Sequence, residues 1–170
     1  MNTILFTAST TDYNDKIAEG LVHLTLSELI KGPTPAYAAY HPEEKEIEFT
    51  YPEDRTEIIE PKKAGNRYDS YSARYSCVKQ LLYKMEAGDR LLAHSLSDLG
   101  DTASEAENVY FDFLSKGIEL YFYDMSFLDT KKLKLNAEPT SEQKVMIRRI
   151  MDTYYSQKGG FPILTREELY

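Results

Sequence analysis

The sequence contains few of the residues that mark several large classes of protein. It has one cysteine, Cys77, and no tryptophan. A lone cysteine cannot form an intramolecular disulfide or a cysteine-based zinc site, and the three histidines lack ligand spacing, so we expect no metal or other cofactor. No apolar run approaches the roughly 20 residues that span a bilayer, and no secretory signal opens the chain. These absences predict a soluble, cytoplasmic protein without a membrane partner.

Basic residues are also scarce. Lys and Arg number 20 against 28 Asp and Glu, which gives a formal net charge of −8. Residues 1–60 hold 4 basic and 12 acidic residues, whereas residues 61–89 hold 6 and 3. Nonspecific DNA binding depends on neutralising many backbone phosphates. We therefore expect this chain to bind DNA only weakly, or together with a partner protein.

The chain does contain regularly alternating β-prone and helical segments. At 170 residues, of which 42% are hydrophobic and 28% charged, it has the size and composition of one globular domain. Strands are predicted near residues 3–7, 47–51 or 57–60, 90–96 and 118–124, and helices near 14–31, 72–87, 102–116 and 141–156. Capping boxes at Thr102–Glu105 and Thr140–Gln143 begin two of the helices. This alternation predicts a mostly parallel sheet with helices on both faces.

Residues 33–70 differ from the rest of the chain. They contain five of the seven prolines and a glutamate-rich run, which is typical of an insertion or a mobile arm. Several tyrosines in and after this segment are candidates for an interaction surface, because tyrosine buries a large area at small entropic cost: Tyr37, Tyr40, Tyr51, Tyr68, Tyr71 and Tyr75. His94 lies in a predicted strand, where a satisfied core or edge histidine is expected rather than a metal ligand.

The loop after the first predicted strand is a candidate binding site. In parallel sheets ligands bind beyond the carboxyl ends of the strands. Residues 7–12 are rich in hydroxyl groups and precede a helix, so Thr7 and Thr10, with Arg67 as a nearby cation, are candidates to bind phosphate. The loop has no glycine to bring the backbone around an anion, and Ser/Thr clusters also serve as simple helix caps. Both interpretations stay open.

Two segments resemble the catalytic domain of serine recombinases, the resolvase and invertase family. The first covers residues 85–130: Glu86–Asp89 with its Gly-Asp, the apolar strand, the loop Ser95–Asp101, the helix from Thr102 and the strand introduced by Lys116-Gly117. The second is Leu5–Thr10, which is similar to the strand-end motif Tyr-x-Arg-Val-Ser-Thr. The resemblance implies a flavodoxin-like three-layer sandwich over residues 1–139, a dimerisation helix over 140–158 and a tail over 159–170.

The same resemblance assigns chemistry to a few residues. It implies that Ser9 is the nucleophile that attacks a DNA phosphodiester, with arginines stabilising the developing charge. Arg74 is the one matching arginine. Thr7 stands in place of the motif's arginine, and Asp98 and Asp101 stand in place of the two arginines of the loop. Each also has a structural interpretation: a helix-capping serine, two carboxylates at a helix start, and a paired surface arginine.

These departures favour a serine-recombinase-like protein of bacterial or mobile-element origin that is degenerate in DNA cleavage. We expect it to act by self-association, as a homodimer or higher oligomer, or by binding a partner. An active site-specific serine recombinase using Ser9 and Arg74 is one alternative, and a phosphate- or nucleotide-binding flavodoxin-like protein is another. The last helix is expected to form the dimer through a wide apolar face: Met146, Ile147, Ile150, Met151, Tyr154 and Tyr155.

Overall fold

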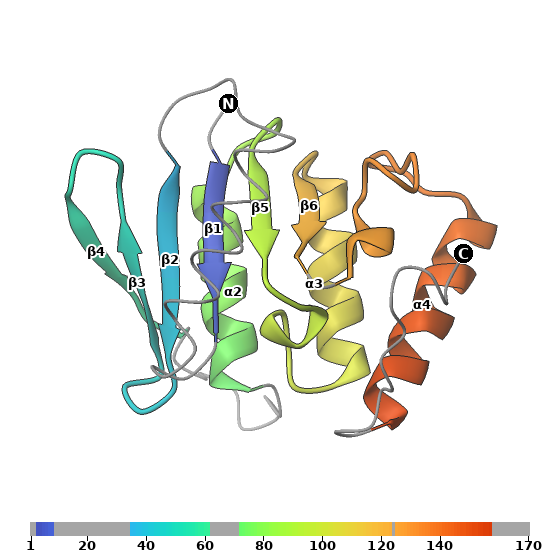
Figure 1. Ribbon diagram of the computed structural model, residues 1–170, viewed down its shortest axis with the longest axis horizontal. Coiled ribbons are helices and arrows are strands. Elements are labelled where there is room, and N and C mark those ends of the chain that lie inside the picture. The colour runs from blue at the N-terminus through green and yellow to red at the C-terminus, as the bar shows by residue number, and fades with distance from the viewer. Residues whose placement is uncertain (1–2, 9–34, 62–71, 124, 158–170) are drawn as a thin grey trace.

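The computed structural model describes residues 3–8, 35–61, 72–123 and 125–157 (Figure 1). These residues form an α/β structure with one six-stranded mixed sheet of order β4-β3-β2-β1-β5-β6. The strands are β1 Thr3–Thr7, β2 Ala36–His41, β3 Glu46–Thr50, β4 Thr56–Ile59, β5 Arg90–Ala93 and β6 Glu119–Phe122. The helices are α2 Ala73–Lys84, α3 Ala103–Ser115 and α4 Ser141–Ser156, with short 3₁₀ turns η3 Leu96–Asp98 and η4 Ser126–Leu128.

The sheet has a parallel part and an antiparallel part. Strands β2, β1, β5 and β6 are parallel neighbours, and β3 and β4 continue the sheet beside β2 as antiparallel strands. This order differs from the flavodoxin-like order 2-1-3-4-5. Both alternative predicted strands of the segment 33–70 form, as β3 and β4. Strand β2 was not expected, because its alternating Ala and Tyr residues lack the β-branched residues that usually signal a strand.

The far edge of the sheet, at β6, is closed by the chain itself. The backbone N–H of Phe122 donates to the Asp129 carboxylate at 2.8 Å, and that of Leu120 donates to the Thr130 hydroxyl at 3.1 Å. The backbone N–H of Thr130 donates in return to the Leu120 carbonyl at 3.0 Å. These groups occupy the positions that a further strand would need, which explains why β6 is the last strand in the described residues.

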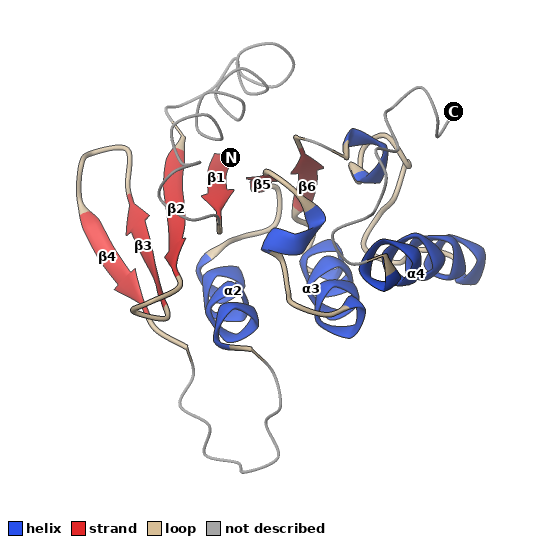
Figure 2. Cartoon of the chain, turned by 60° about the horizontal axis from the view of Figure 1, so that its bottom comes forward, coloured by secondary structure: helices blue, strands red, loops and turns tan. Residues whose placement is uncertain are grey.

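Helices α2 and α3 lie side by side on one face of the sheet, and α4 packs on the outer side of α3 (Figure 2). The core between them includes Phe6, Val78, Leu81, Val109 and Phe113. On the opposite face, the register neighbours Leu5 and Leu92 are buried as well. Both faces at the centre of the sheet are therefore covered, as a parallel sheet requires. The helix predicted near 14–31, on which a third layer depends, lies outside the described residues.

The three described helices confirm the predictions near 72–87, 102–116 and 141–156. At α4 the expected capping box is present, since Thr140 and Gln143 exchange side-chain to backbone hydrogen bonds of 3.1 and 2.9 Å. At α3 it is only half formed. The Thr102 hydroxyl accepts from the Glu105 N–H at 3.2 Å, but the Glu105 carboxylate binds other groups. None of the helices in the described ranges is long and apolar enough to cross a membrane.

The apolar face expected to form a dimer proves to be mostly internal. Ile147 and Met151 are buried in the core, and Ile150, Tyr154 and Tyr155 pack against it. Of the six residues predicted for that face, only Met146 is exposed. The helical period identifies an apolar stripe without showing whether the chain's own core or another copy covers it, and here the chain's own core covers most of it. Dimerisation through α4 stays a prediction.

Candidate functional site

The candidate site lies where the parallel strands end, at the lower edge of the sheet in Figure 1, here called the carboxyl edge. Strand β5 leads there into the loop from His94 to Asp101, which contains η3 and ends at the start of α3. Helix α2 also begins at this edge, after Ser72. The topology thus brings Arg74 next to the loop that carries Asp98 and Asp101, although 27 residues separate Arg74 from Asp101.

Arg74 and Asp101 form an ion pair. A guanidinium nitrogen of Arg74 donates to the Asp101 carboxylate, and the two side chains are 19% and 56% exposed. The Nε atom of Arg74 is buried and has no hydrogen-bond partner among the residues that the structure describes. Arg74 is therefore largely shielded from solvent, and its charge is balanced by Asp101.

Asp98 is turned back into its own loop. Its side chain is buried, with 4% of the residue exposed, and one carboxylate oxygen accepts from the backbone N–H groups of His94 and Ser95, each at 3.2 Å. Burial raises the pKa of Asp98 to about 6, although these two amides and nearby Arg74 favour the charged form. Asp98 therefore has a structural role in this loop, because its carboxylate closes the 3₁₀ turn η3.

Glu105 joins the starts of the two helices. Its carboxylate accepts from the Ser72 N–H at 2.7 Å, the Ser72 hydroxyl at 2.8 Å and the Asp101 N–H at 2.9 Å, and only 3% of the residue is exposed. The sequence indicated Glu105 only as part of a local capping box. Its long-range partner, Ser72, has no sequence signal, because nothing in the chain indicates that α2 and α3 begin side by side.

The last turn of α4 also reaches this loop. The Tyr155 hydroxyl donates to the Gly100 carbonyl at 2.6 Å, and burial raises the pKa of this tyrosine. Gly100 is tightly enclosed, since a Cβ atom there would lie 2.6 Å from the Cβ of Glu105. The sequence indicated Gly100 only as part of the loop and placed Tyr155 on the predicted dimer face. Tyr155, a residue outside the predicted site, therefore helps to hold its loop in place.

Of the remaining predicted site residues, only Thr7 lies within the described part of the chain. Ser9, Thr10 and Arg67 are outside the described residues. Thr7 is the half-buried last residue of β1.

Among the tyrosines proposed for an interaction surface, Tyr37 is exposed, but Tyr40 and Tyr75 are buried in the core, so that prediction is wrong for these two. Tyr68 and Tyr71 are outside the described residues. The hydroxyl of half-buried Tyr51 donates to Glu57 at 2.7 Å.

The expectation for His94 is partly met. Its ring stacks on Tyr123 with centroids 5.6 Å apart, and burial lowers its pKa. In the part of the chain that the structure describes, no three His, Cys, Asp or Glu residues are grouped as a metal site.

The charge balance at the carboxyl edge determines what chemistry its described residues can support. Asp98, Asp101 and Glu105 contribute three carboxyl groups, and Arg74 contributes one guanidinium. The transition state of phosphoryl transfer needs concentrated positive charge around the phosphate. These residues instead carry a net negative charge when ionised, and their hydrogen bonds serve to fix the loop and the two helix starts.

No protein-family model matches the chain, and no curated protein matches its sequence.

Proposed function

We propose that this chain is a serine-recombinase-like α/β protein that has lost DNA strand cleavage and acts by associating with itself. The observation that carries the proposal is the ion pair between Arg74 and Asp101. The resemblance retains one active-site arginine, and in this chain an aspartate at the position of a second arginine neutralises it.

The energetics support loss of cleavage. Unit charges about 4 Å apart interact by roughly 4 kcal/mol at an effective dielectric near 20. A DNA phosphate that approached Arg74 would displace or repel the Asp101 carboxylate and would gain little net attraction. A serine hydroxyl is a poor nucleophile without cationic assistance. Ser9 would therefore lack the electrostatic stabilisation that the family reaction requires.

Strand order and the last helix add support. The parallel strands follow the order β2-β1-β5-β6, which matches the first four strands of the flavodoxin-like arrangement once the β3–β4 hairpin is set aside. Helix α4 occupies the position that the resemblance assigns to a dimerisation helix, and its side away from α3 carries exposed Val145 and Met146. A flavodoxin-like core with a self-associating helix is the architecture we propose.

Covalent trapping tests the loss of cleavage. Native protein and Ser9→Ala are incubated with a library of random-sequence DNA duplexes, denatured, and analysed for phosphoserine-linked DNA by mass spectrometry. We expect no adduct with either protein. An adduct with the native chain that is absent from Ser9→Ala would show an active recombinase and refute the proposal.

Removal of the counterion of Arg74 tests whether the carboxyl edge can bind DNA. Asp101→Ala leaves Arg74 unpaired, and we expect higher DNA affinity with a salt dependence steeper by about one phosphate contact. Asp112→Ala is the matched control, since it removes the same charge and releases Lys79, which pairs with Asp112 between α2 and α3. Equal gains in the two variants would reflect net charge alone and would count against a recombinase-like site. Tight binding of inorganic phosphate or a nucleotide, without DNA, would favour the phosphate-binding alternative.

A further inference from the structure

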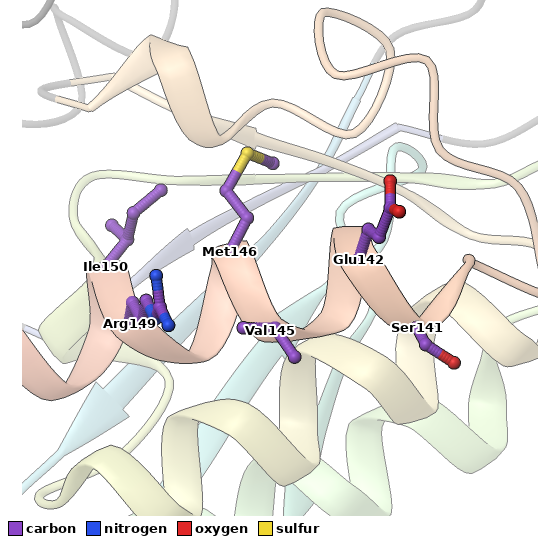
Figure 3. A pocket seen from close by; sticks show the side chains of 6 residues that line it. All are labelled: Ser141, Glu142, Val145, Met146, Arg149 and Ile150. Carbon is purple, nitrogen blue, oxygen red and sulfur yellow. The ribbon is translucent and has the colours of Figure 1, made fainter.

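Helix α4 carries an open groove on the side that faces away from α3. The groove has a volume of about 500 Å³ and is lined by six residues of this helix (Figure 3): Ser141, Glu142, Val145, Met146, Arg149 and Ile150. Val145 and Met146 are 46% and 40% exposed, although both are large apolar side chains. In Figure 3, Glu142, Met146 and Ile150 project from the same side of the helix. We call this surface the outer face of α4.

The two charged residues of the outer face, which are opposite in sign, lie symmetrically about the point between Val145 and Met146. Glu142 and Arg149 lie at equal distances on either side of that point, and so do Ser141 and Ile150. A surface whose chemistry reverses about its centre, acidic at one end and basic at the other, is complementary to a second copy of itself turned end to end. A two-fold dimer needs this type of self-complementary surface.

We propose that two copies of this chain pair through antiparallel α4 helices, with the two-fold axis between Val145 and Met146. Glu142 then faces Arg149 of the partner subunit, and Arg149 faces Glu142 of the partner subunit. Val145 of each copy packs against Met146 of the partner subunit. This pairing specifies the geometry of the self-association in the proposed function, on which it rests.

The charges select this orientation. Glu142 and Arg149 are seven residues apart, which is about 10 Å along a helix, so two separate ion pairs flank the apolar centre. Parallel helices in register would place Glu142 beside Glu142 and Arg149 beside Arg149 of the partner subunit, and both contacts would be repulsive. Arg148 is engaged within its own chain, because its guanidinium lies 5.4 Å from the centroid of the Phe111 ring.

The size of the surface sets the expected strength. One pair of helices of this length buries less area than a standard protein interface of about 1,600 Å². We therefore expect a reversible dimer whose dissociation constant is measurable by sedimentation equilibrium. Exposed ion pairs contribute little individually, but reversal of one charge turns two attractions across the two-fold axis into two repulsions.

Charge exchange tests the pairing. Glu142→Arg alone and Arg149→Glu alone should each weaken dimerisation about 10-fold, which corresponds to about 1.4 kcal/mol. The double variant Glu142→Arg with Arg149→Glu exchanges the two charges and should restore dimerisation to near the native value. Glu44→Arg, an exposed reversal in the turn between β2 and β3, is the matched control and should leave the dimer unchanged.

Cysteine cross-linking tests the orientation independently. Val145→Cys lies next to the two-fold axis and should form an intermolecular disulfide under mild oxidation. Ser141→Cys should not, because antiparallel pairing separates its two copies by nine residues, or about 13 Å along the helices. The native Cys77 is buried and serves as the background in both variants. A disulfide at both positions would indicate parallel helices and overturn the proposal.

The outcomes separate this pairing from self-association in general. If the protein dimerises but the double variant stays as weak as the single ones, or if no α4 variant has an effect, the antiparallel pairing is wrong while self-association stands. If the native chain stays monomeric at the highest concentrations measured, both the pairing and the self-association are wrong.

Discussion

Removal of the Glu105 carboxylate should destabilise the protein more than removal of any exposed glutamate. In Glu105→Ala, the Ser72 N–H, the Ser72 hydroxyl and the Asp101 N–H lose the acceptor that they share at 2.7 to 2.9 Å. A buried donor that loses its partner costs about 1–3 kcal/mol, and bonds to a charged group lie toward the upper end. Because part of the site will admit water, we expect a total loss of about 3–5 kcal/mol, a large fraction of a typical folding stability.

Urea denaturation measures this loss, and Glu86→Ala is the control. Glu86 is an exposed glutamate just after α2, and its substitution should change the free energy of unfolding by less than about 0.5 kcal/mol. Hydrogen exchange adds a local readout, since the amides of Ser72 and Asp101 should exchange faster in Glu105→Ala. If the two variants have equal stability, Glu105 does not hold the helix starts together and the reasoning about this edge fails.

Three further predictions concern the same loop and the contact between α3 and α4. Burial raises the pKa of Asp98 from near 4 in the unfolded chain to about 6 in the folded protein, so the folded state binds this proton more tightly. The free energy of unfolding should therefore fall as the pH rises from 4 to 6, and in Asp98→Asn it should lack this decrease when denaturation is measured over the same range. Burial, and then Asp152, raises the pKa of Glu107 to about 7, so Asp152→Asn should lower that pKa in an NMR titration and increase stability at pH 8. Gly100→Ala should cost about 1–3 kcal/mol in thermal unfolding, because the new Cβ would overlap that of Glu105; a neutral substitution would show that the loop is not enclosed.

Local sequence signals predicted the helices better than the sheet. The capping residues Thr102 and Thr140 act within one turn, so their effect is visible in the sequence, and α3 and α4 begin where they predict. Strand β2 was missed because Ala36 and Ala38 carry little β-propensity and form a strand only through pairing with β1 and β3. The β6 edge is closed by the side chains of Asp129 and Thr130, which follow this strand in the chain, but the sequence patterns described above did not indicate that closure.

The candidate site shows the same division. The sequence placed Arg74, Asp98 and Asp101 together only through the family resemblance, and the structure brings Arg74 to the loop that carries both aspartates. The contributions of Ser72, Glu105 and Tyr155 depend on which helix ends meet in space. Periodicity identified Tyr155 as part of an apolar stripe, but its hydroxyl bonds to the Gly100 carbonyl, which only the fold could show.

The two aspartates of the loop, Asp98 and Asp101, are not equivalent, and this difference determines how the site can be altered. Asp101 is half exposed and serves mainly as the counterion of Arg74. Its replacement by arginine would remove this ion pair and add repulsion between two guanidinium groups, but it would bury no new charge. Asp98 is buried and holds the amides of His94 and Ser95, so an arginine there would lose both bonds and place an uncompensated charge in the core of the loop. A cation at position 101 is therefore compatible with this loop, whereas a cation at position 98 requires the loop to be rebuilt. Reversal of both charges together should therefore unfold the loop rather than create a phosphate site, because the Asp98 carboxylate holds the two amides that close the turn.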